Sequence, residues 1–185
     1  MSNSALNSQP GNRNYLSPVG FKFTLAKAPK VEFFSNFAGI PAITLGSAVQ
    51  TRFGKNIDVP GDKMNFEDLR LRFLVDEYLE NYMQIHNWMT GLGFPYSLKQ
   101  YSDLQREDID EYRENPKSLQ FEVSDGTLQI LGSNFIPTAN VIFTDLFPTF
   151  LSALEFDATQ EDVRYFTAEV NFKYTYYRID TLMDN

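Results

Sequence analysis

The stretch that decides the fold runs from Leu69 to Gly91 and reads LRLRFLVDEYLENYMQIHNWMTG. Apolar side chains stand at every odd position from Leu69 to Val75, and both arginines of this segment stand at even positions. Side chains two residues apart lie on the same face of a strand. The segment therefore predicts a central strand that buries its odd-numbered face and exposes its arginines.

The period changes at Asp76, where apolar residues begin to recur every three or four positions. This stripe consists of Tyr78, Tyr82, Ile85 and Met89. Asp76 is placed to cap the first turn, and Gly91 is placed to end the last. The spacing predicts one α-helix over about residues 76–90 that packs on the sheet through this stripe.

Short alternating runs separated by turn residues extend outward from this segment in both directions. The further strands expected are Phe21 to Leu25, Val31 to Phe37, Ser47 to Phe53, Asn56 to Val59, Ser118 to Ser124, Thr127 to Leu131, Asn134 to Thr144, Leu151 to Phe156, and a long strand from Val163 to Arg178. We expect Ser47 to Val59 to form a protruding hairpin and Asp125-Gly126 to form a type I′ turn. About eight strands with one helix predict a mainly β fold, an antiparallel β-sandwich or barrel with one packed α-helix.

The chain has 185 residues and a mass of 21.3 kDa, which suits one globular domain. Residues 1–17 are rich in Ser, Asn and Gln and predict a flexible, extended N-terminal arm, so residues 18–185 are expected to form a single β domain. The arm lacks the apolar core of a signal peptide, and no run of about 18 apolar residues follows it. We therefore expect no membrane association.

The charge balance and the absence of cysteine exclude several classes of function. The formal net charge is -8, and residues 103–114 hold six acids against two bases, which favours a solvated acidic loop. A protein that binds DNA tightly needs a basic face instead. With no cysteine in the chain, disulfides, thiolate metal sites and thiol catalysis are excluded.

Catalytic signatures are missing as well. His86 is the only histidine, and the chain contains no phosphate-binding loop, nucleophile elbow or complete dinucleotide fingerprint. We expect no enzymatic activity, no catalytic residues, no cofactor and no metal, and we expect His86 to be structural and excluded from solvent.

Aromatic residues are numerous, with 17 Phe and 10 Tyr. In the last expected strand Tyr165 and Tyr177 fall on the outer face. An aromatic face or a long unpaired edge favours association, so a partner or a second copy is expected to cover it. The alternative is that these tyrosines expose their hydroxyl groups above buried rings.

The segment from Arg52 to Trp88 reads RFGKNIDVPGDKMNFEDLRLRFLVDEYLENYMQIHNW. A basic, glycine-bearing hairpin leads into an I-x-V-x-G-D turn, an F-x-D, an alternating strand, and an acidic helix start before a tryptophan. This order resembles the tail tube proteins of contractile-tailed bacteriophages. The matching positions are Ile57, Val59, Gly61, Asp62, Phe66, Asp68, Asp76, Glu77 and Trp88.

The resemblance implies a structural virion protein that closes into hexameric rings, which stack into a tube for genome delivery. Its partners would be further copies, the tail sheath and the baseplate; DNA would pass the lumen without specific binding, and assembly would occur in the host cytoplasm. The hairpin from Ser47 to Pro60 would reach a neighbouring copy. The residues expected to serve assembly are Arg52, Lys55, Ile57, Val59, Gly61, Asp62, Trp88, Tyr165 and Tyr177.

Two alternatives remain open. A baseplate tube initiator or a tail terminator of the same fold would form one ring and stop. A monomeric β-barrel, from a different class, would bind a small ligand or glycan through Trp88 and the tyrosines.

Overall fold

A computed structural model describes residues 15–16, 18–104, 122–156, 159 and 165–182. The expected arm at residues 1–17 and the acidic segment 103–114 lie mostly outside this part. The strands are β1 (Phe21–Leu25), β2 (Ser35–Ala38), β3 (Ile43–Arg52), β4 (Lys55–Phe66), β5 (Leu69–Leu74), β6 (Ser124–Leu131), β7 (Pro137–Leu151), β8 (Thr167–Lys173) and β9 (Tyr176–Thr181). The labelled helices are α1 (Pro29–Phe33) and α2 (Glu80–Gly93), and residues 98–104 are helical as well.

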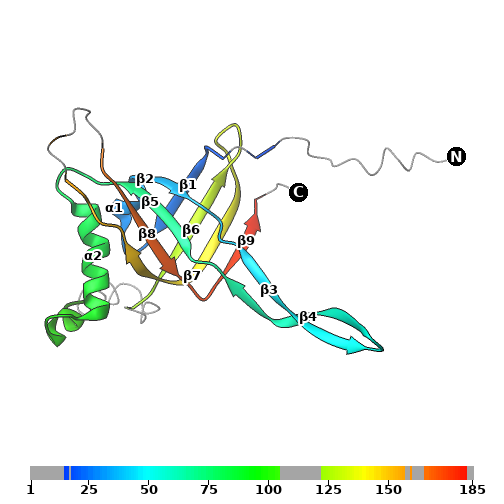
Figure 1. Ribbon diagram of the computed structural model, residues 1–185. Helices are drawn as coiled ribbons and strands as arrows, with labels where there is room; N and C mark the ends of the chain where they lie inside the picture. Colours follow the sequence, from blue (N-terminus) through cyan, green and yellow to red (C-terminus); the bar gives the residue numbers. More distant parts are fainter. Residues whose placement is uncertain (1–14, 17, 105–121, 157–158, 160–164, 183–185) are drawn as a thin grey trace, which may run out of the picture.

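The strands of the body pair antiparallel in the order β1-β6-β7-β8-β5-β2, and β9 pairs with β7. Strand β7 is shared, because Ala139–Thr144 pairs with β9 and Phe147–Leu151 pairs with β8. The result is two sheets joined through one long bent strand, with α2 packed at one side (Figure 1). The expected mainly β fold, a sandwich with a packed helix, is confirmed.

The β3–β4 hairpin forms a separate two-stranded sheet that projects from the side of the body opposite α2 (Figure 1). The structure confirms the expected hairpin and extends it at both ends, from Ile43 to Phe66. Every residue of β3 is exposed in the protomer.

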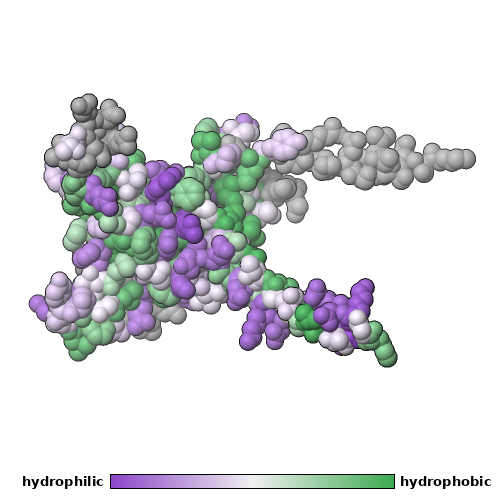
Figure 2. All heavy atoms as spheres, in the orientation of Figure 1, coloured by the Kyte–Doolittle hydropathy of each residue, from purple (hydrophilic) through white to green (hydrophobic). Residues whose placement is uncertain are grey.

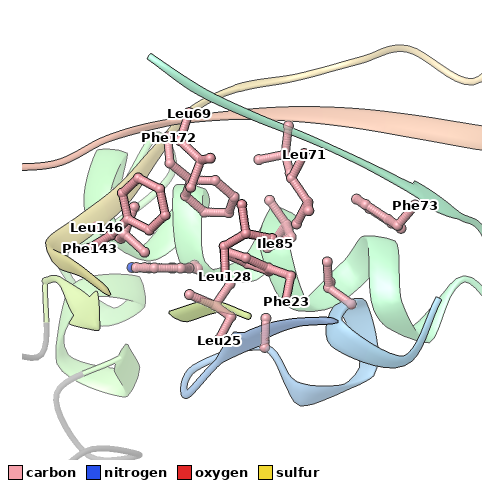
Figure 3. Close-up of a cluster of buried hydrophobic side chains, with 14 of the residues drawn as sticks. Phe23, Leu25, Leu69, Leu71, Phe73, Ile85, Leu128, Phe143, Leu146 and Phe172 are labelled. Atoms are coloured by element: carbon pink, nitrogen blue, oxygen red, sulfur yellow. The ribbon is translucent and has the colours of Figure 1, made fainter. Parts of the chain in front are cut away.

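The core lies between the two sheets and α2 (Figure 3). Strand β5 alternates buried and exposed residues as expected, with Leu69, Leu71 and Phe73 inside. Aromatic rings from three other strands meet this face, namely Phe23, Phe143 and Phe172. Each fully buried side chain of this size contributes roughly 1.5–3 kcal/mol through removal of apolar surface from water.

Helix α2 begins four residues later than expected, because Leu79 takes a left-handed conformation (φ 59°) immediately before it. Asp76 still serves the helix start: its Oδ1 accepts from Asn81 N at 3.4 Å, and the buried Asn81 side chain donates to Leu74 O at 2.7 Å. The N-cap position itself is Leu79, which makes no side-chain cap bond, so Asp76 serves one first-turn N–H from outside the helix and is not its cap.

The buried stripe of α2 differs from the expected one. It consists of Asn81, Ile85, Trp88 and Gly91. Tyr78 is 79% exposed, so its assignment to the packed face is wrong. Gly91 does not end the helix: a Cβ there would lie 3.0 Å from Leu104, so glycine allows residues 98–104 to pack against α2.

Two other expected strands are wrong. Residues 31–37 contain α1 before β2, because Pro29 suits the first position of a helix and Val31 N donates to Ala28 O at 3.1 Å. Residues 152–156 form no strand, because β7 ends at Leu151.

The expected Asp125-Gly126 turn is also wrong, because both residues lie inside β6. Gly126 pairs with Phe143 beside a register shift in the β6–β7 ladder. A Cβ at Gly126 would lie 2.4 Å from Cδ1 of the buried Leu146. Glycine is therefore required here for close packing at a bulge and not for a turn.

The long strand expected from Val163 to Arg178 is divided into β8 and β9, and residues 163–164 lie outside the described part. The pairing with β7 nevertheless keeps its register across the break, since Phe147 faces Lys173 and Thr144 faces Tyr176, and it shifts only between Pro148 and Phe150. The pairing bends at Asp145, which has a φ of 59°. In the sequence the apolar alternation runs on to Tyr176, which explains the missed break, whereas in the structure the inward side changes from the even-numbered Phe172 to the odd-numbered Tyr177.

Candidate assembly surfaces

The β3–β4 hairpin brings four of the expected assembly residues onto one face. Directly paired residues of an antiparallel ladder share a face. Arg52 pairs with Lys55, Gln50 with Ile57, and Ala48 with Val59. This face, called the cationic face below, is apolar along its middle and carries two positive charges at its outer end.

The opposite face of the outer hairpin has a different character. It carries the pairs Ser47–Pro60, Val49–Asp58 and Thr51–Asn56. Because one face is polar and weakly acidic and the other cationic, the hairpin can present two chemically different surfaces to its surroundings.

The turn that joins β3 to β4 consists of Phe53 (φ 44°) and Gly54 (φ 75°). Two positive φ values define a type I′ turn, in which Asn-Gly is the favoured pair. A bulky phenylalanine is unfavourable in this conformation. Phe53 is 99% exposed, and the outer end of the hairpin is hydrophobic beside hydrophilic residues (Figure 2). Phe53 was not among the expected site residues, although Phe-Gly between two strands was a readable signal.

Gly61 and Asp62 lie at a constriction halfway along the hairpin. The register shifts between Leu45 and Ser47, and a Cβ at Gly61 would lie 2.6 Å from the carbonyl oxygen of Gly46. The two backbones therefore approach too closely for any side chain at Gly61. Asp62 is exposed next to this contact. The role of Gly61 that the structure supports is to shape the hairpin.

An aromatic cluster anchors the base of the hairpin to the body. Phe66 of β4 contacts Tyr174 and Tyr177 edge-on, with centroids 6.0 and 5.6 Å apart. Tyr177 also packs on Phe143 and donates a hydrogen bond to Pro41 O at 3.1 Å. Tyr177 is therefore half-buried and hydrogen-bonded within its own chain, whereas the sequence pattern predicted that it faces outward.

Tyr174 donates a hydrogen bond to Glu67 O at 2.8 Å. Burial raises the pKa of its phenol to about 12, with further contributions from Tyr177 and from the carboxylates of Asp68 and Glu67. Burial disfavours the charged phenolate, and this desolvation is the largest cause of the raised pKa.

A shallow hollow of about 220 Å³ lies beside this cluster. It is lined by Met64, Asn65, Phe66, Glu67, Asp68, Lys173 and Tyr174. We call it the hairpin-base hollow. Asp68 Oδ1 and Lys173 Nζ lie 3.9 Å apart and form a surface ion pair. Such a pair contributes little to the stability of the fold.

Trp88 and Tyr165 occupy opposite environments. Trp88 is 4% exposed, its Nε1 donates to Glu122 O at 3.1 Å, and its ring packs on Phe172. This burial assigns Trp88 to the core of the protomer and gives neither a second copy nor a glycan access to its ring. Tyr165 is 83% exposed, close in sequence to Phe166, which packs on Phe156.

His86 lies on the exposed side of α2, so the expectation that it is excluded from solvent is wrong. The helix buries Ile85 and Trp88, and position 86 points away from that side. Among the described residues, no three His, Asp or Glu side chains gather as a metal site would require. In the part of the chain that the structure describes, no helix has the length and apolarity needed to span a membrane.

Comparison by sequence finds no matching family model and no matching curated protein. Comparison of folds finds the anti-feeding prophage cap, described as the tube terminating cap, with a TM-score of 0.63 at 16% identity, covering 98% of this chain and 99% of the cap. The tube of an extracellular contractile injection system, solved as the PVC sheath-tube complex, matches with a TM-score of 0.55 at 14% identity, covering 98% and 99%.

The sheath/tube terminator of the same PVC system matches with a TM-score of 0.55 at 17% identity, covering 91% of this chain and 99% of the other. These matches span 91–98% of the chain. They confirm, at the level of the fold, the likeness inferred from residues 52–88. The chain has the tail tube fold shared by tube, cap and terminator proteins of contractile injection systems.

Proposed function

We propose that this protein is a structural subunit of a contractile phage tail or related injection machine, whose copies form hexameric rings that stack into a tube. The observation that carries the proposal is the projecting β3–β4 hairpin. Its large apolar residues are exposed in the protomer, namely Ile43, Leu45, Val49, Phe53, Ile57 and Met64.

An isolated two-stranded hairpin is at best marginally stable in water, and exposed apolar strands promote association. A neighbouring copy that covers the hairpin would remove both problems. A contact between unlike surfaces either closes into a ring or continues along an axis, so one fold can produce rings and a tube.

The net charge of -8 is compatible with a tube through which DNA passes. A lumen rich in carboxylates repels phosphate groups, so DNA would slide through without binding. We propose genome delivery as the function of the tube, with the cargo of an injection system as the alternative. The sheath and the baseplate would be its other partners, in a particle assembled in the host cytoplasm.

A cap or terminator is the second candidate, because a tube terminating cap and a sheath/tube terminator share this fold at TM-scores of 0.63 and 0.55. Such a subunit would form a single ring and end the tube. A baseplate protein of the anti-feeding prophage also shares the fold, with a TM-score of 0.53, which keeps a tube initiator in the same class.

Light scattering and negative-stain imaging over a concentration series test the proposal. Tubes of open-ended length support the tube subunit, single rings support the cap or initiator, and a monomer at every concentration contradicts both. The double variant Arg52→Glu/Lys55→Glu should block assembly and leave the protomer folded. The matched control is Arg70→Glu/Lys99→Glu, which makes the same charge change on the exposed body.

A further inference from the structure

The phenyl group of Phe53 has no explanation within the described protomer. It is 99% exposed, and its backbone adopts a φ of 44° that asparagine or glycine would occupy with less strain. Strained residues in exposed positions concentrate at functional contacts. An aromatic ring at the outermost point of a projecting arm is also the typical anchor of a protein interface.

The hairpin-base hollow has the chemistry to receive this ring. Met64, Phe66 and Tyr174 provide apolar walls, and Glu67 and Asp68 add carboxylates at its rim. Its volume of about 220 Å³ lies below the roughly 300 Å³ at which small-molecule pockets begin, so it suits one side chain.

We propose that Phe53 of one copy inserts into the hairpin-base hollow of a second copy, with Arg52 and Lys55 facing the carboxylates of Glu67 and Asp68. The charges are complementary, since two cations flank the turn and the hollow carries the two acids Glu67 and Asp68 against one cation, Lys173. The hollow of the same copy is out of reach, because the extended strand β4 leads from the turn at its first residue to the hollow at its last three. This contact rests on the proposed self-assembly and specifies how it occurs.

The first test replaces Phe53 with asparagine, which restores the favoured Asn-Gly turn. Phe53→Asn should keep the protomer folded and raise the concentration required for assembly by about tenfold or more. Unchanged assembly by Phe53→Asn would overturn the proposed contact. Reduced assembly with an intact hairpin cannot be attributed to a damaged turn, because the substitution relaxes it.

The second test mixes two defective copies. Glu67→Lys changes a side chain that lines the hollow and keeps the backbone oxygen to which Tyr174 donates a hydrogen bond. Glu77→Lys makes the same charge change at an exposed site and is the matched control. A Glu67→Lys copy retains the Phe53 turn, and a Phe53→Asn copy retains the hollow. Their mixture should form one-to-one complexes that neither forms alone, and its failure to do so would count against a turn-to-hollow contact.

The third test uses the absence of cysteine in the chain. An Asn56→Cys copy, which keeps Phe53, mixed with an Asn65→Cys copy should give a heterodimer with a short bis-maleimide, while a Lys99→Cys partner should not. If the wild type assembles and this crosslink does not form, the inference fails and the proposed function stands. If the wild type stays monomeric throughout, both fail.

Discussion

The Thr175 hydroxyl donates a hydrogen bond to Oδ2 of Asp145 over 2.9 Å, at the point where β7 passes from one sheet to the other. Asp145 has a φ of 59°, and Thr175 N donates to Thr144 O at 3.0 Å. Because both strands bend together, the ladder keeps its register across the corner. This pair holds the bend that lets one strand belong to two sheets.

Replacement of Asp145 tests this account of the corner. Asp145→Ala should lower the free energy of unfolding by about 1–2 kcal/mol, because alanine tolerates a positive φ poorly and leaves Thr175 without its acceptor. Asp145→Asn, which tolerates this conformation and retains an acceptor, should stay within about 0.5 kcal/mol of the wild type. Urea unfolding measures both, and an equal loss in both variants would contradict this explanation.

Gly126 tests the close packing at the β6 bulge. Gly126→Ala should destabilise the fold by about 1–3 kcal/mol, because the new Cβ would lie 2.4 Å from buried Leu146. Gly39→Ala is the matched control, since the nearest atom there is 3.9 Å away and belongs to the end of a side chain. Thermal unfolding compares the two, and similar midpoints would show that Leu146 moves aside without cost.

Trp88 is the only tryptophan and lies in the core. Trp88→Ala should cost about 3–5 kcal/mol, because it removes a large buried ring and leaves a cavity. In the wild type, intrinsic fluorescence should report on unfolding of the core. It should respond little to assembly through the hairpin, and a large emission shift on assembly would contradict the placement of Trp88 away from the contact.

The pKa of Tyr174, raised to about 12 from the ordinary 10.0 of a tyrosine, predicts a loss of stability at alkaline pH. Below pH 10 the phenol is protonated in the folded and unfolded states. As the pH rises from 10 toward 12, the unfolded state releases its proton first, so the free energy of unfolding falls.

Comparison with Tyr174→Phe separates the effect of this phenol on stability from the pH dependence that both proteins share. At neutral pH the variant should be less stable by about 1 kcal/mol, because the hydrogen bond to Glu67 O is lost. The two stability curves should converge between pH 10 and 12. Parallel curves would contradict the raised pKa.

Part of the candidate site could be predicted from the sequence, and part of it could not. Arg52, Lys55, Ile57 and Val59 were recognisable from the sequence, because a basic hairpin with alternating residues determines which side chains share a face. Phe53 was missed, since its importance comes from complete exposure at a strained turn. The hairpin-base hollow was not predictable, because β4, β8 and the residues after β4 meet there through pairing across the whole chain.

Alternation along the chain by itself determined the mainly β class, the central strand β5, the hairpin and the presence of α2, because each depends on neighbours within a few residues. Only the tertiary structure explains the residues at the bulge and at the bend. Gly126 is a glycine because Leu146 packs against it from another strand, and Asp145 bends because β8 and β9 both pair with β7. Such contacts join residues far apart in sequence, and no local pattern records them.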